Sequence, residues 1–589
     1  MQPTILKRRY IIRIIESSSF ALGLFFVAVS WATWPVLPNF YDAIPTGDSP
    51  TATVPQLNCW IMWWNMSSLL HGFKYYWHAP FFYPAHSTLA FSEPLTGTLL
   101  FAPLIRLFGT AIPAYNALVF FTLVLNGVFA RKLLVEIGCT RTVALFGGLS
   151  LCFHPLALQN LEAVQLAAIW PCLWCISLII RFTSKPTVAT GSLLGLSVSL
   201  QCFFCMHHLL FWCILLAIVG WLALRQLALR KAIPGLLAAL ATCVCLAGPI
   251  VFRVSQTHAE YEFTRSEDIV RVLSANYGDW LTSQNFAWTS LWGLPEANFP
   301  LLPGACRVFL AGLCFFLLRR RIKLAHQLLF AIAAVSVLLS FGARLSIGQF
   351  NLWEVAAHWF SPLGSVRSPY RFAYFAQMAI LLLASISLDL VVRKLIPKRS
   401  TEKQIDTSAE SQTSGSSVRR FFGTTCVCGL LLLLVLEVRP PQSYLSYPPS
   451  PSRQEAWVKH IQRSVPWDSP LLCLPVAEFN TEADQQRETT WMMYATLHTR
   501  PIVNGYSGFS PPFWLDLRSK LREDQIDDRV FSQLRSEGIR FLVLRTDLPT
   551  SAKYLRWLDQ YVSETKQTYR DDRYSVYEIV AGKPTAMVN

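Results

Sequence analysis

Apolar runs of membrane-spanning length recur along most of this chain. A transmembrane helix needs about 20 consecutive, mainly apolar residues. Such runs alternate here with shorter polar or basic segments, which predicts a polytopic α-helical membrane protein with about 11 transmembrane helices. The runs cover residues 18–37, 112–131, 142–159, 163–182, 188–205, 207–225, 232–252, 303–319, 324–342, 371–392 and 421–438.

Short clusters of Lys and Arg between the runs set the predicted orientation, because such clusters favour the cytoplasmic side. All of them fall on one side if the N-terminus is cytoplasmic and the C-terminus is exterior. This requires that Leu95–Gly109, an apolar stretch that is short and contains Pro103 and Arg106, does not span the membrane. The clusters lie at residues 7–13, 131–141, 181–185, 225–231, 319–323 and 393–420.

Three polar segments then project to the exterior from a predicted transmembrane domain, residues 1–438: residues 39–109, 253–302 and 343–370. The first of them is rich in Trp, Tyr and Phe, which suits helices that lie in the membrane interface. Residues 393–420 are rich in Ser, Thr, Gln and Lys, which predicts a disordered cytoplasmic linker.

Composition changes after the last apolar run, and residues 439–589 read as a soluble exterior domain. Short β-type runs alternate there with amphipathic helical runs, which predicts a small α/β domain. The predicted strands lie within 469–476, 500–506, 539–545 and 574–580, and the predicted helices within 482–498, 512–521, 527–538 and 551–562.

The overall composition agrees with the membrane class, since 53% of the 589 residues are hydrophobic and 15% are charged. The 51 Lys and Arg exceed the 36 Asp and Glu. This excess does not indicate nucleic-acid binding, because the basic residues fall in clusters between apolar runs. The C-x-x-C pairs Cys172/Cys175 and Cys202/Cys205 lie within apolar runs, without zinc-type histidine spacing, and we interpret them as packing residues.

Several motifs, taken in their order along the chain, resemble the GT-C superfamily of membrane glycosyltransferases, above all uncharacterised bacterial members. The similarity covers about the first 390 residues and extends more weakly into the C-terminal domain. The motifs are GDSPTATVPQLNCWIMWW (47–64), FYPAHSTLAFSEPLTGTLLFAPLIRLFG (82–109), AYNALVFFTLVLNGVFARKLL (114–134), FHPLALQNLEAVQLAAIWPCLW (153–174), SVRSPYRFAYFAQMAILLLASISL (365–388) and PIVNGYSGF (501–509).

This resemblance implies a catalytic acid in the loop after the first span, and Asp48 is the position that matches best. A carboxylate there suits a general base at headgroup depth. An alternative is structural, since T-G-D-S-P also favours a turn or a helix cap. Asp42 is a weaker base candidate, and Glu93 is either a further candidate or an N-cap. No D-x-D motif occurs in the loop, so no metal ligands are predicted and divalent-metal dependence stays open.

Arg367 and Arg371 lie four residues apart at the predicted start of a helix, with Pro369 in its first turn. Two guanidiniums at a helix N-terminus suit the phosphate of a lipid-linked donor. The alternative is an interfacial pair that binds headgroups or carboxylates of the C-terminal domain. Arg265 and Arg271 are candidates to assist at the phosphate. Glu162 is a candidate for donor or acceptor hydroxyls, or a cap at a helix start.

The resemblance therefore implies an integral-membrane glycosyltransferase of a bacterial inner membrane, with its C-terminal domain in the periplasm. The implied partners are a polyprenyl-phosphate-linked sugar, membrane lipids and an unidentified glycan, lipid or protein acceptor, and no nucleic acid. Two alternatives stay open. One is a non-catalytic scaffold or polymer-binding protein with the same fold, and the other is a transporter or flippase, although no internal repeat is visible.

Overall fold

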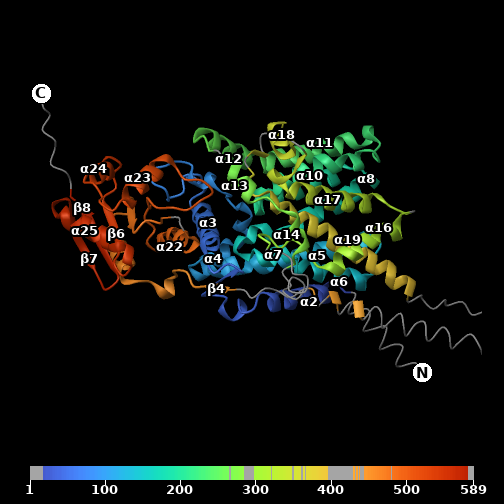
Figure 1. Ribbon diagram of the computed structural model, residues 1–589, viewed down its shortest axis with the longest axis horizontal. Helices are drawn as coiled ribbons and strands as arrows, with labels where there is room; N and C mark the ends of the chain where they lie inside the picture. Colours follow the sequence, from blue (N-terminus) through green and yellow to red (C-terminus); the bar gives the residue numbers. More distant parts are fainter. Residues whose placement is uncertain are drawn as a thin grey trace, which may run out of the picture. The chain divides into compact units, whose positions relative to one another are not determined.

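The computed structural model forms two compact units (Figure 1). Unit 1 comprises Met1–Trp34, Val119–Ala247 and Thr264–Gln442, and unit 2 comprises Pro35–Leu118, Gly248–Phe263 and Ser443–Asn589. Unit 2 thus combines the first predicted exterior segment with the C-terminal residues, across the domain boundary at 438 that the sequence predicts. The structure describes residues 17–263, 267–283, 297–319, 321–347, 350–359, 363, 364, 366–395, 429, 430, 433, 434, 437, 444–478 and 481–580.

Unit 1 is helical and is built around α19 (Ala373–Leu395) (Figure 1). Nearly every residue from Ala373 to Asp389 is buried, because the helix is apolar on all sides and neighbouring helices cover it. It packs against α6, α16 and α17. The other helices of unit 1 are α2 (Ser18–Ala32), most of α5 (Ile112–Ile137), α6 (Arg141–Cys152), α7 (Pro155–Gln159), η4 (Leu161–Ala167), α8 (Trp170–Ser184), α9 (Val188–Phe204), α10 (Met206–Leu224), α11 (Leu229–Leu246), α13 (Glu267–Val272), α14 (Tyr277–Leu281), α16 (Ala305–Leu318), α17 (Leu324–Ser340), η5 (Gly342–Arg344), α18 (Leu352–Trp359) and η7 (Pro369–Phe372).

Within the described residues, 6 helical stretches are long and apolar enough to cross a membrane, and the chain is a helical integral membrane protein. Five shorter apolar helices accompany them, so the count of about 11 spans stays a prediction. The predicted run 421–438 lies mainly outside the described residues, as does the predicted linker after residue 395. The six stretches are Ile112–Ile137, Arg141–Gln159, Leu161–Ser184, Met206–Leu224, Leu229–Leu246 and Pro369–Leu395, and the shorter helices are Ser18–Ala32, Thr96–Phe108, Val188–Phe204, Ala305–Leu318 and Leu324–Ser340.

One predicted run, residues 232–252, is divided in the structure. Helix α11 ends at Leu246, and a separate helix, α12 (Gly248–Glu260), belongs to unit 2. Pro249 lacks a backbone N–H and disfavours helical geometry in the residue before it, which explains a break at this point. Helix α11 also packs closely on α9, where a Cβ on Gly191 would lie 1.9 Å from the carbonyl oxygen of Gly235.

Three of the predicted cytoplasmic clusters lie together at one end of unit 1. The carboxylate of Asp389 accepts hydrogen bonds from the backbone and hydroxyl of Thr140, at 2.9 and 2.7 Å, and pairs with Arg393 at 2.7 Å. Arg393 also donates to the carbonyl of Gly138, and Arg181 pairs with Glu136. The loops that carry these basic residues therefore share one face, as the alternation of charge requires. Which side of the membrane this face occupies stays a prediction.

Unit 2 contains a four-stranded sheet in the order β5-β6-β8-β7 (Figure 1). Strands β5 (Leu471–Leu474) and β6 (Phe541–Arg545) are parallel, whereas β8 (Tyr574–Ile579) is antiparallel to both β6 and β7 (Thr565–Arg570). Helices of the same unit are α21 (Ala456–Ser464), α22 (Glu482–His498), α23 (Pro512–Arg522), α24 (Arg529–Ser536) and α25 (Ala552–Gln560), with short turns η1 (Leu37–Asn39), η2 (Thr88–Phe91), η8 (Pro451–Arg453), η9 (Pro549–Ser551) and η10 (Val562–Glu564).

The first exterior segment continues this sheet beyond β5. The backbone of Ile502 pairs with Leu471 of β5 as a parallel bridge. On its other side, Ile502 donates to the carbonyl of Pro80 and accepts from the N–H of Tyr83, both at 3.1 Å. The N–H of Phe82 likewise donates to the carbonyl of residue 504 at 3.1 Å. Residues 80–83 therefore form part of the sheet edge, more than 400 residues before their partners.

The aromatic helix of this segment, α3 (Thr53–Leu70), is buried rather than exposed along most of its length. It packs against α22 and against the short elements η3 (Thr96–Phe101) and α4 (Ala102–Phe108). Trp60 is fully buried, with the ring of Phe81 edge-on at 4.9 Å. Apolar side chains are exposed instead at the end of α3 and on η3 and α4: Leu69, Leu70, Leu100 and Leu107. That this segment lies in the membrane interface stays a prediction.

Candidate functional site

Asp48 follows a two-stranded ribbon that joins the first exterior segment to the C-terminal residues of unit 2. Strand β1 (Ile44–Gly47) pairs antiparallel with β4 (Tyr444–Ser446). The strand ends at Gly47, whose φ of +63° suits glycine better than any other residue, and the chain turns there. Because this turn precedes Asp48 directly, the ribbon fixes the point at which the carboxylate leaves the fold.

The loop after Asp48 is attached to the first turn of α22 by polar side chains. The hydroxyl of Thr51 donates to the carboxylate of Glu482 at 3.3 Å, and the backbone N–H of Ala52 donates to Oε1 of Gln486 at 3.0 Å. On the other side, the hydroxyl of Thr46 donates to the carbonyl of Ser49 at 2.5 Å. The loop is thus held at both ends while Asp48 itself takes no part in these bonds.

The Asp48 side chain is exposed, and within the described part of the chain it accepts no hydrogen bond and forms no ion pair. Partial desolvation raises the pKa of its carboxyl to about 6. The N-cap of α3 is Ala52, and no side chain caps that helix. Asp48 therefore does not act as the cap of α3, which leaves its carboxylate free to bind a ligand or a proton.

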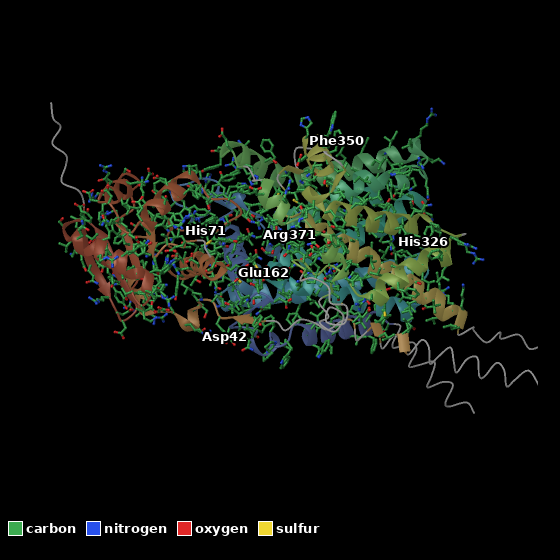
Figure 2. All side chains as sticks on the ribbon, in the orientation of Figure 1. Asp42, His71, Glu162, His326, Phe350 and Arg371 are labelled. Atoms are coloured by element: carbon green, nitrogen blue, oxygen red, sulfur yellow. The ribbon has the colours of Figure 1, made fainter. Side chains whose placement is uncertain are left out.

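The two other carboxylates of the first segment are in different surroundings. Asp42 is exposed in a turn before β1, where its N–H donates to the carbonyl of Asn39 at 3.1 Å (Figure 2). Glu93 is buried between η2 and η3. The N-cap of η3 is Leu95, without a side-chain hydrogen bond, so Glu93 does not cap this helix. Among the three carboxylates, Asp48 combines exposure with a raised pKa.

Arg371 lies in unit 1, in η7, a short 3-10 turn that leads directly into α19 (Figure 2). Pro369 occupies the first turn of η7, as the sequence predicts. The neighbouring Tyr370 stacks on Phe299 with ring centroids 4.0 Å apart. The Nε atom of Arg371 is buried and has no hydrogen-bond partner within the described residues. Buried guanidinium donors normally have acceptors, so this position suits an anionic ligand.

The other predicted phosphate ligands differ from Arg371 in position. Arg367 is exposed and lies before η7, so the two arginines do not share one helical face, contrary to the i,i+4 arrangement expected. The reason is that Ser368, the N-cap, has non-helical backbone angles. Arg271 is exposed in the last turn of α13. Arg265 lies outside the described residues.

Glu162 lies in the first turn of η4 in unit 1 and is partly exposed (Figure 2). The residue before this turn, Asn160, is its N-cap, without a side-chain cap bond, and instead donates to the hydroxyl of Tyr374 at 3.1 Å. Tyr374, at the start of α19, lies three residues after Arg371 of η7, so Asn160 contacts the chain close to the arginine. Sequence reasoning missed Tyr374, although its i,i+3 spacing from Arg371 was visible.

His154 supports this arrangement as a neutral side chain. Its Nδ1 accepts from the N–H of Ala157 at 3.2 Å, so the proton resides on Nε2, which donates to the carbonyl of Tyr374 at 3.0 Å. The two rings also stack at 5.6 Å. The histidine therefore positions Tyr374. No group of three or more His, Cys, Asp and Glu within the described ranges is arranged to hold a metal ion.

The candidate residues thus divide between the units. Asp48, Asp42 and Glu93 belong to unit 2, whereas Arg367, Arg371, Arg271 and Glu162 belong to unit 1. Chemically, one group offers an acceptor for a proton and the other offers donors for an anion.

Comparison with solved structures gives the fold. The archaeal oligosaccharyltransferase AglB from Archaeoglobus fulgidus, in complex with an inhibitory peptide and a dolichol-phosphate, is 10% identical over 93% of this chain and 72% of its own, with a TM-score of 0.51. The arabinofuranosyltransferase AftD from Mycobacteria is 12% identical over 94% of this chain and 41% of its own, with a TM-score of 0.53.

ArnT from Cupriavidus metallidurans, bound to undecaprenyl phosphate, aligns over 97% of this chain and 98% of its own at 11% identity, with a TM-score of 0.47. No protein-family model matches the chain, and no curated protein matches it. At these identities the similarity concerns the fold, and AglB and AftD carry it. The chain therefore shares the fold of AglB and AftD, in agreement with the resemblance that its sequence motifs show.

Proposed function

We propose that this protein transfers a sugar from a polyprenyl-phosphate donor to an acceptor on the non-cytoplasmic side of a membrane. The observation that carries the proposal is the similarity in fold to AglB and AftD, which are both glycosyltransferases. The dolichol-phosphate in the AglB complex supports a lipid-linked donor. Fold alone does not specify chemistry, so the roles below rest on the residues of this chain.

In this proposal Asp48 is the general base. The acceptor oxygen attacks the anomeric carbon, the bond between that carbon and the phosphate oxygen breaks, and the polyprenyl phosphate leaves with the bonding electrons. Asp48 accepts the proton that the acceptor hydroxyl loses. A carboxyl with a pKa of about 6 is mostly ionised at neutral pH and still basic enough to accept a proton. Asp42 and Glu93 are second candidates for the same role.

The leaving phosphate requires cations. Arg371 is the first candidate, because its buried Nε has no partner within the described residues and a phosphate oxygen would satisfy it. Arg367 and Arg271, both exposed, are candidates to assist, together with Arg265. Glu162, two residues after the Asn160 that bonds Tyr374, is the candidate for binding sugar hydroxyls. We further propose the predicted orientation, with the C-terminal residues in the periplasm of a bacterium.

The test is a transfer assay with the full chain in lipid nanodiscs. Radiolabelled polyprenyl-phosphate sugars would be incubated with membrane extracts as acceptors, with and without a chelator of divalent metals. Asp48→Asn should lower the turnover rate by about 100-fold or more. The exposed Asp524 provides a matched control, and Asp524→Asn should transfer at the wild-type rate. Full transfer by Asp48→Asn would remove Asp48 from the mechanism.

Arg371 is tested separately through the donor. Arg371→Lys keeps the charge but loses the planar set of donors, and it should raise the KM for the lipid-linked sugar by about tenfold. Arg319→Lys, at the end of α16, is the matched control. A kcat and a donor KM that both stay at the wild-type values would place Arg371 outside the phosphate site.

The same preparation distinguishes the two alternative functions. Flux of a lipid-linked sugar into proteoliposomes without a covalent product would identify a transporter or flippase. Binding of a cell-wall polymer with neither flux nor transfer would identify a scaffold. Mass spectrometry of lipid-linked sugars and surface glycans in a deletion strain would then show which donor accumulates and which glycan is lost.

A further inference from the structure

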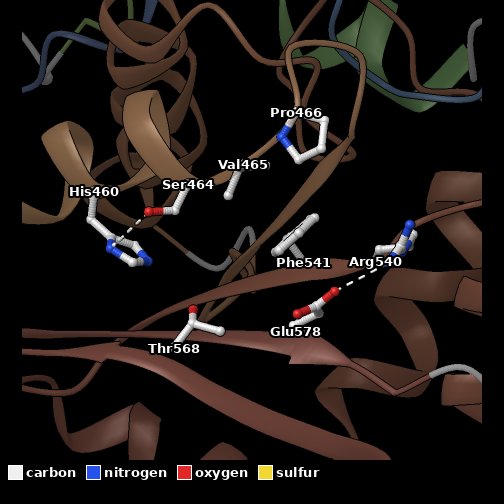
Figure 3. A pocket seen from close by; sticks show the side chains of 8 residues that line it. All are labelled: His460, Ser464, Val465, Pro466, Arg540, Phe541, Thr568 and Glu578. Carbon is white, nitrogen blue, oxygen red and sulfur yellow. Dashed lines mark hydrogen bonds and ion pairs between the residues drawn. The ribbon is translucent and has the colours of Figure 1, made fainter.

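A cavity lies in unit 2, in the C-terminal part of the chain, and none of the candidate donor or base residues lines it. It has a volume of about 220 Å³ and lies between the end of α21 and one face of the sheet (Figure 3). We call it the α21 pocket. Its lining residues are His460, Ser464, Val465, Pro466, Arg540, Phe541, Thr568 and Glu578.

The polar groups of the α21 pocket are both donors and acceptors. Arg540 donates to Oε1 of Glu578 at 3.1 Å, which leaves further guanidinium N–H groups and the second carboxylate oxygen to face a ligand (Figure 3). The hydroxyl of Thr568 donates to the carbonyl of Val576 at 3.3 Å and keeps its lone pairs. Ser464 adds a second hydroxyl. The pocket therefore offers several hydrogen bonds of each polarity.

His460 contributes an unsatisfied nitrogen. Its Nδ1 lies 3.5 Å from the hydroxyl of Ser464, and its ring stacks on Tyr569 at 5.0 Å. The Nε2 atom is buried and has no hydrogen-bond partner within the described residues. Desolvation lowers the pKa of this imidazole, so it is neutral at pH 7. An unsatisfied buried nitrogen beside a cavity calls for a ligand that brings a hydrogen-bonding group.

The charges of the pocket select among ligand classes. Arg540 and Glu578 compensate each other, so an anion would meet the carboxylate and a cation would meet the guanidinium. A neutral molecule with several hydroxyls avoids both conflicts, because each hydroxyl donates and accepts. Val465, Pro466 and Phe541 supply an apolar wall for the C–H face of such a molecule.

An exposed tryptophan follows directly on this wall. Trp467, the residue after Pro466, is 78% exposed. Large exposed aromatic rings with a polar N–H are typical of recognition surfaces. Ser464 and His460 do not suggest covalent catalysis, because no carboxylate within the described residues orients the histidine from its Nε2.

We propose that the α21 pocket binds one sugar unit of a neutral glycan, with Arg540, Glu578 and His460 bonding its hydroxyls and Trp467 flanking the next unit. This site is separate from the proposed donor and base residues, and it would hold a glycan on the protein independently of transfer. It therefore does not depend on the identity of the base or of the donor phosphate.

The test is binding of neutral methyl glycosides to the full chain in detergent micelles. Methyl glucoside, mannoside, galactoside and arabinofuranoside would be screened by saturation-transfer NMR and by the fluorescence of Trp467, identified through Trp467→Phe. At least one glycoside should bind saturably. Arg540→Ala should weaken that binding by tenfold or more, whereas Arg529→Ala, at a side chain that is 90% exposed, should leave it unchanged.

Thr568→Ile narrows the cavity and removes a hydroxyl without removing a charge, and it should weaken binding while the transfer rate stays at the wild-type value. Saturable binding of none of the four glycosides would overturn the proposal. Equal affinity in wild type and Arg540→Ala would also overturn it, and tighter binding of inorganic phosphate than of any glycoside would reassign the pocket to anions.

Discussion

Two carboxyl groups of unit 2, Asp48 and Glu488, have raised pKa values for the same physical reason and yet differ in every other respect. Desolvation raises the pKa of Asp48 to about 6 and that of Glu488 to about 7. Asp48 is exposed at the end of a ribbon and has no hydrogen-bond partner within the described residues. Glu488 is fully buried in α22 and is bonded on both oxygens.

The partners of Glu488 show that it is structural. Its Oε1 accepts from the N–H of Ala477 at 2.7 Å, and its Oε2 accepts from Nδ2 of Asn504 at 3.0 Å. Asn504 in turn accepts from the N–H of Cys473 at 2.7 Å and donates to its carbonyl at 2.9 Å. This network fixes α22, β5 and residues 500–506, which bridge to β5, to one another.

The comparison teaches that a raised pKa marks a partly or fully desolvated carboxyl but does not by itself mark a catalytic one. The distinction lies in the unused hydrogen-bonding capacity. Both carboxylate oxygens of Glu488 accept hydrogen bonds within the fold, whereas those of Asp48 remain available to a ligand. Four experiments follow from this difference, in order of decreasing effect.

The largest effect should be the pH dependence of transfer. A general base must be ionised, so the turnover rate should fall about tenfold per pH unit below the pKa of Asp48, which is about 6. The rate of radiolabelled transfer would be measured between pH 4 and 8, with the stability of the protein followed in parallel. Glu488→Gln should show the same profile. A profile that is flat down to pH 4 would contradict the role of Asp48.

Next in size is the loss of the buried carboxyl. Glu488→Ala leaves the N–H of Ala477 and one N–H of the Asn504 side-chain amide without acceptors, and each buried unsatisfied group costs about 1–3 kcal/mol. The free energy of opening the sheet should fall by about 4 kcal/mol. Hydrogen exchange of the β5 and β6 amides in the full chain measures it. Glu523→Ala, at an exposed position, is the control, and equal protection in both variants would show that the network is not stabilising.

A smaller effect concerns the pH dependence of that stability. The folded pKa of Glu488, about 7, exceeds the value of 4.5 for the free side chain, so the folded state binds more protons between these values. Stability is therefore fully present below pH 4.5 and declines as pH rises to 7, by no more than about 3 kcal/mol. Glu488→Gln should remove this slope. A slope that persists in Glu488→Gln would assign it to another group.

The smallest effect should come from the tether of the Asp48 loop. Gln486→Ala removes the acceptor of the Ala52 N–H, which should lower the stability of the loop attachment by about 1 kcal/mol. Because Asp48 would then be positioned less well, the turnover rate should fall by up to about tenfold. Gln485→Ala, one position earlier on α22, is the matched control. If both variants transfer alike, the attachment to α22 does not position the base.

Much of the secondary structure could be predicted from local pattern. The helix predicted at 482–498 is present with those bounds as α22, and α23, α24 and α25 lie within or at the edges of their predicted segments. Strand β7, TKQTYR, was missed because five of its six residues are polar and it lacks a buried face that would give an alternating pattern. The segment 500–506 was predicted as a strand and forms a bridge with Leu471 rather than a named strand.

The candidate site could be predicted only in part. The position of Asp48 after a turn and of Pro369 at a helix start follows from local turn and capping chemistry. The sequence could not show that Arg367 precedes the helix, because the non-helical angles of Ser368 depend on packing around it. Nor could it show that Tyr374 bonds Asn160, since these side chains are 214 residues apart.

The sequence by itself determined the membrane class, the apolar helices and the clusters of basic residues between them. Hydropathy and charge are properties of single segments no longer than one helix. Only the tertiary structure decided that residues 80–83 extend the sheet beside Ile502. It also decided that both oxygens of Glu488 are hydrogen-bonded within the fold while those of Asp48 are not. Backbone and side-chain hydrogen bonds between segments 400 residues apart leave no periodic signal in either segment. Which carboxyl remains available for chemistry was therefore settled by folding.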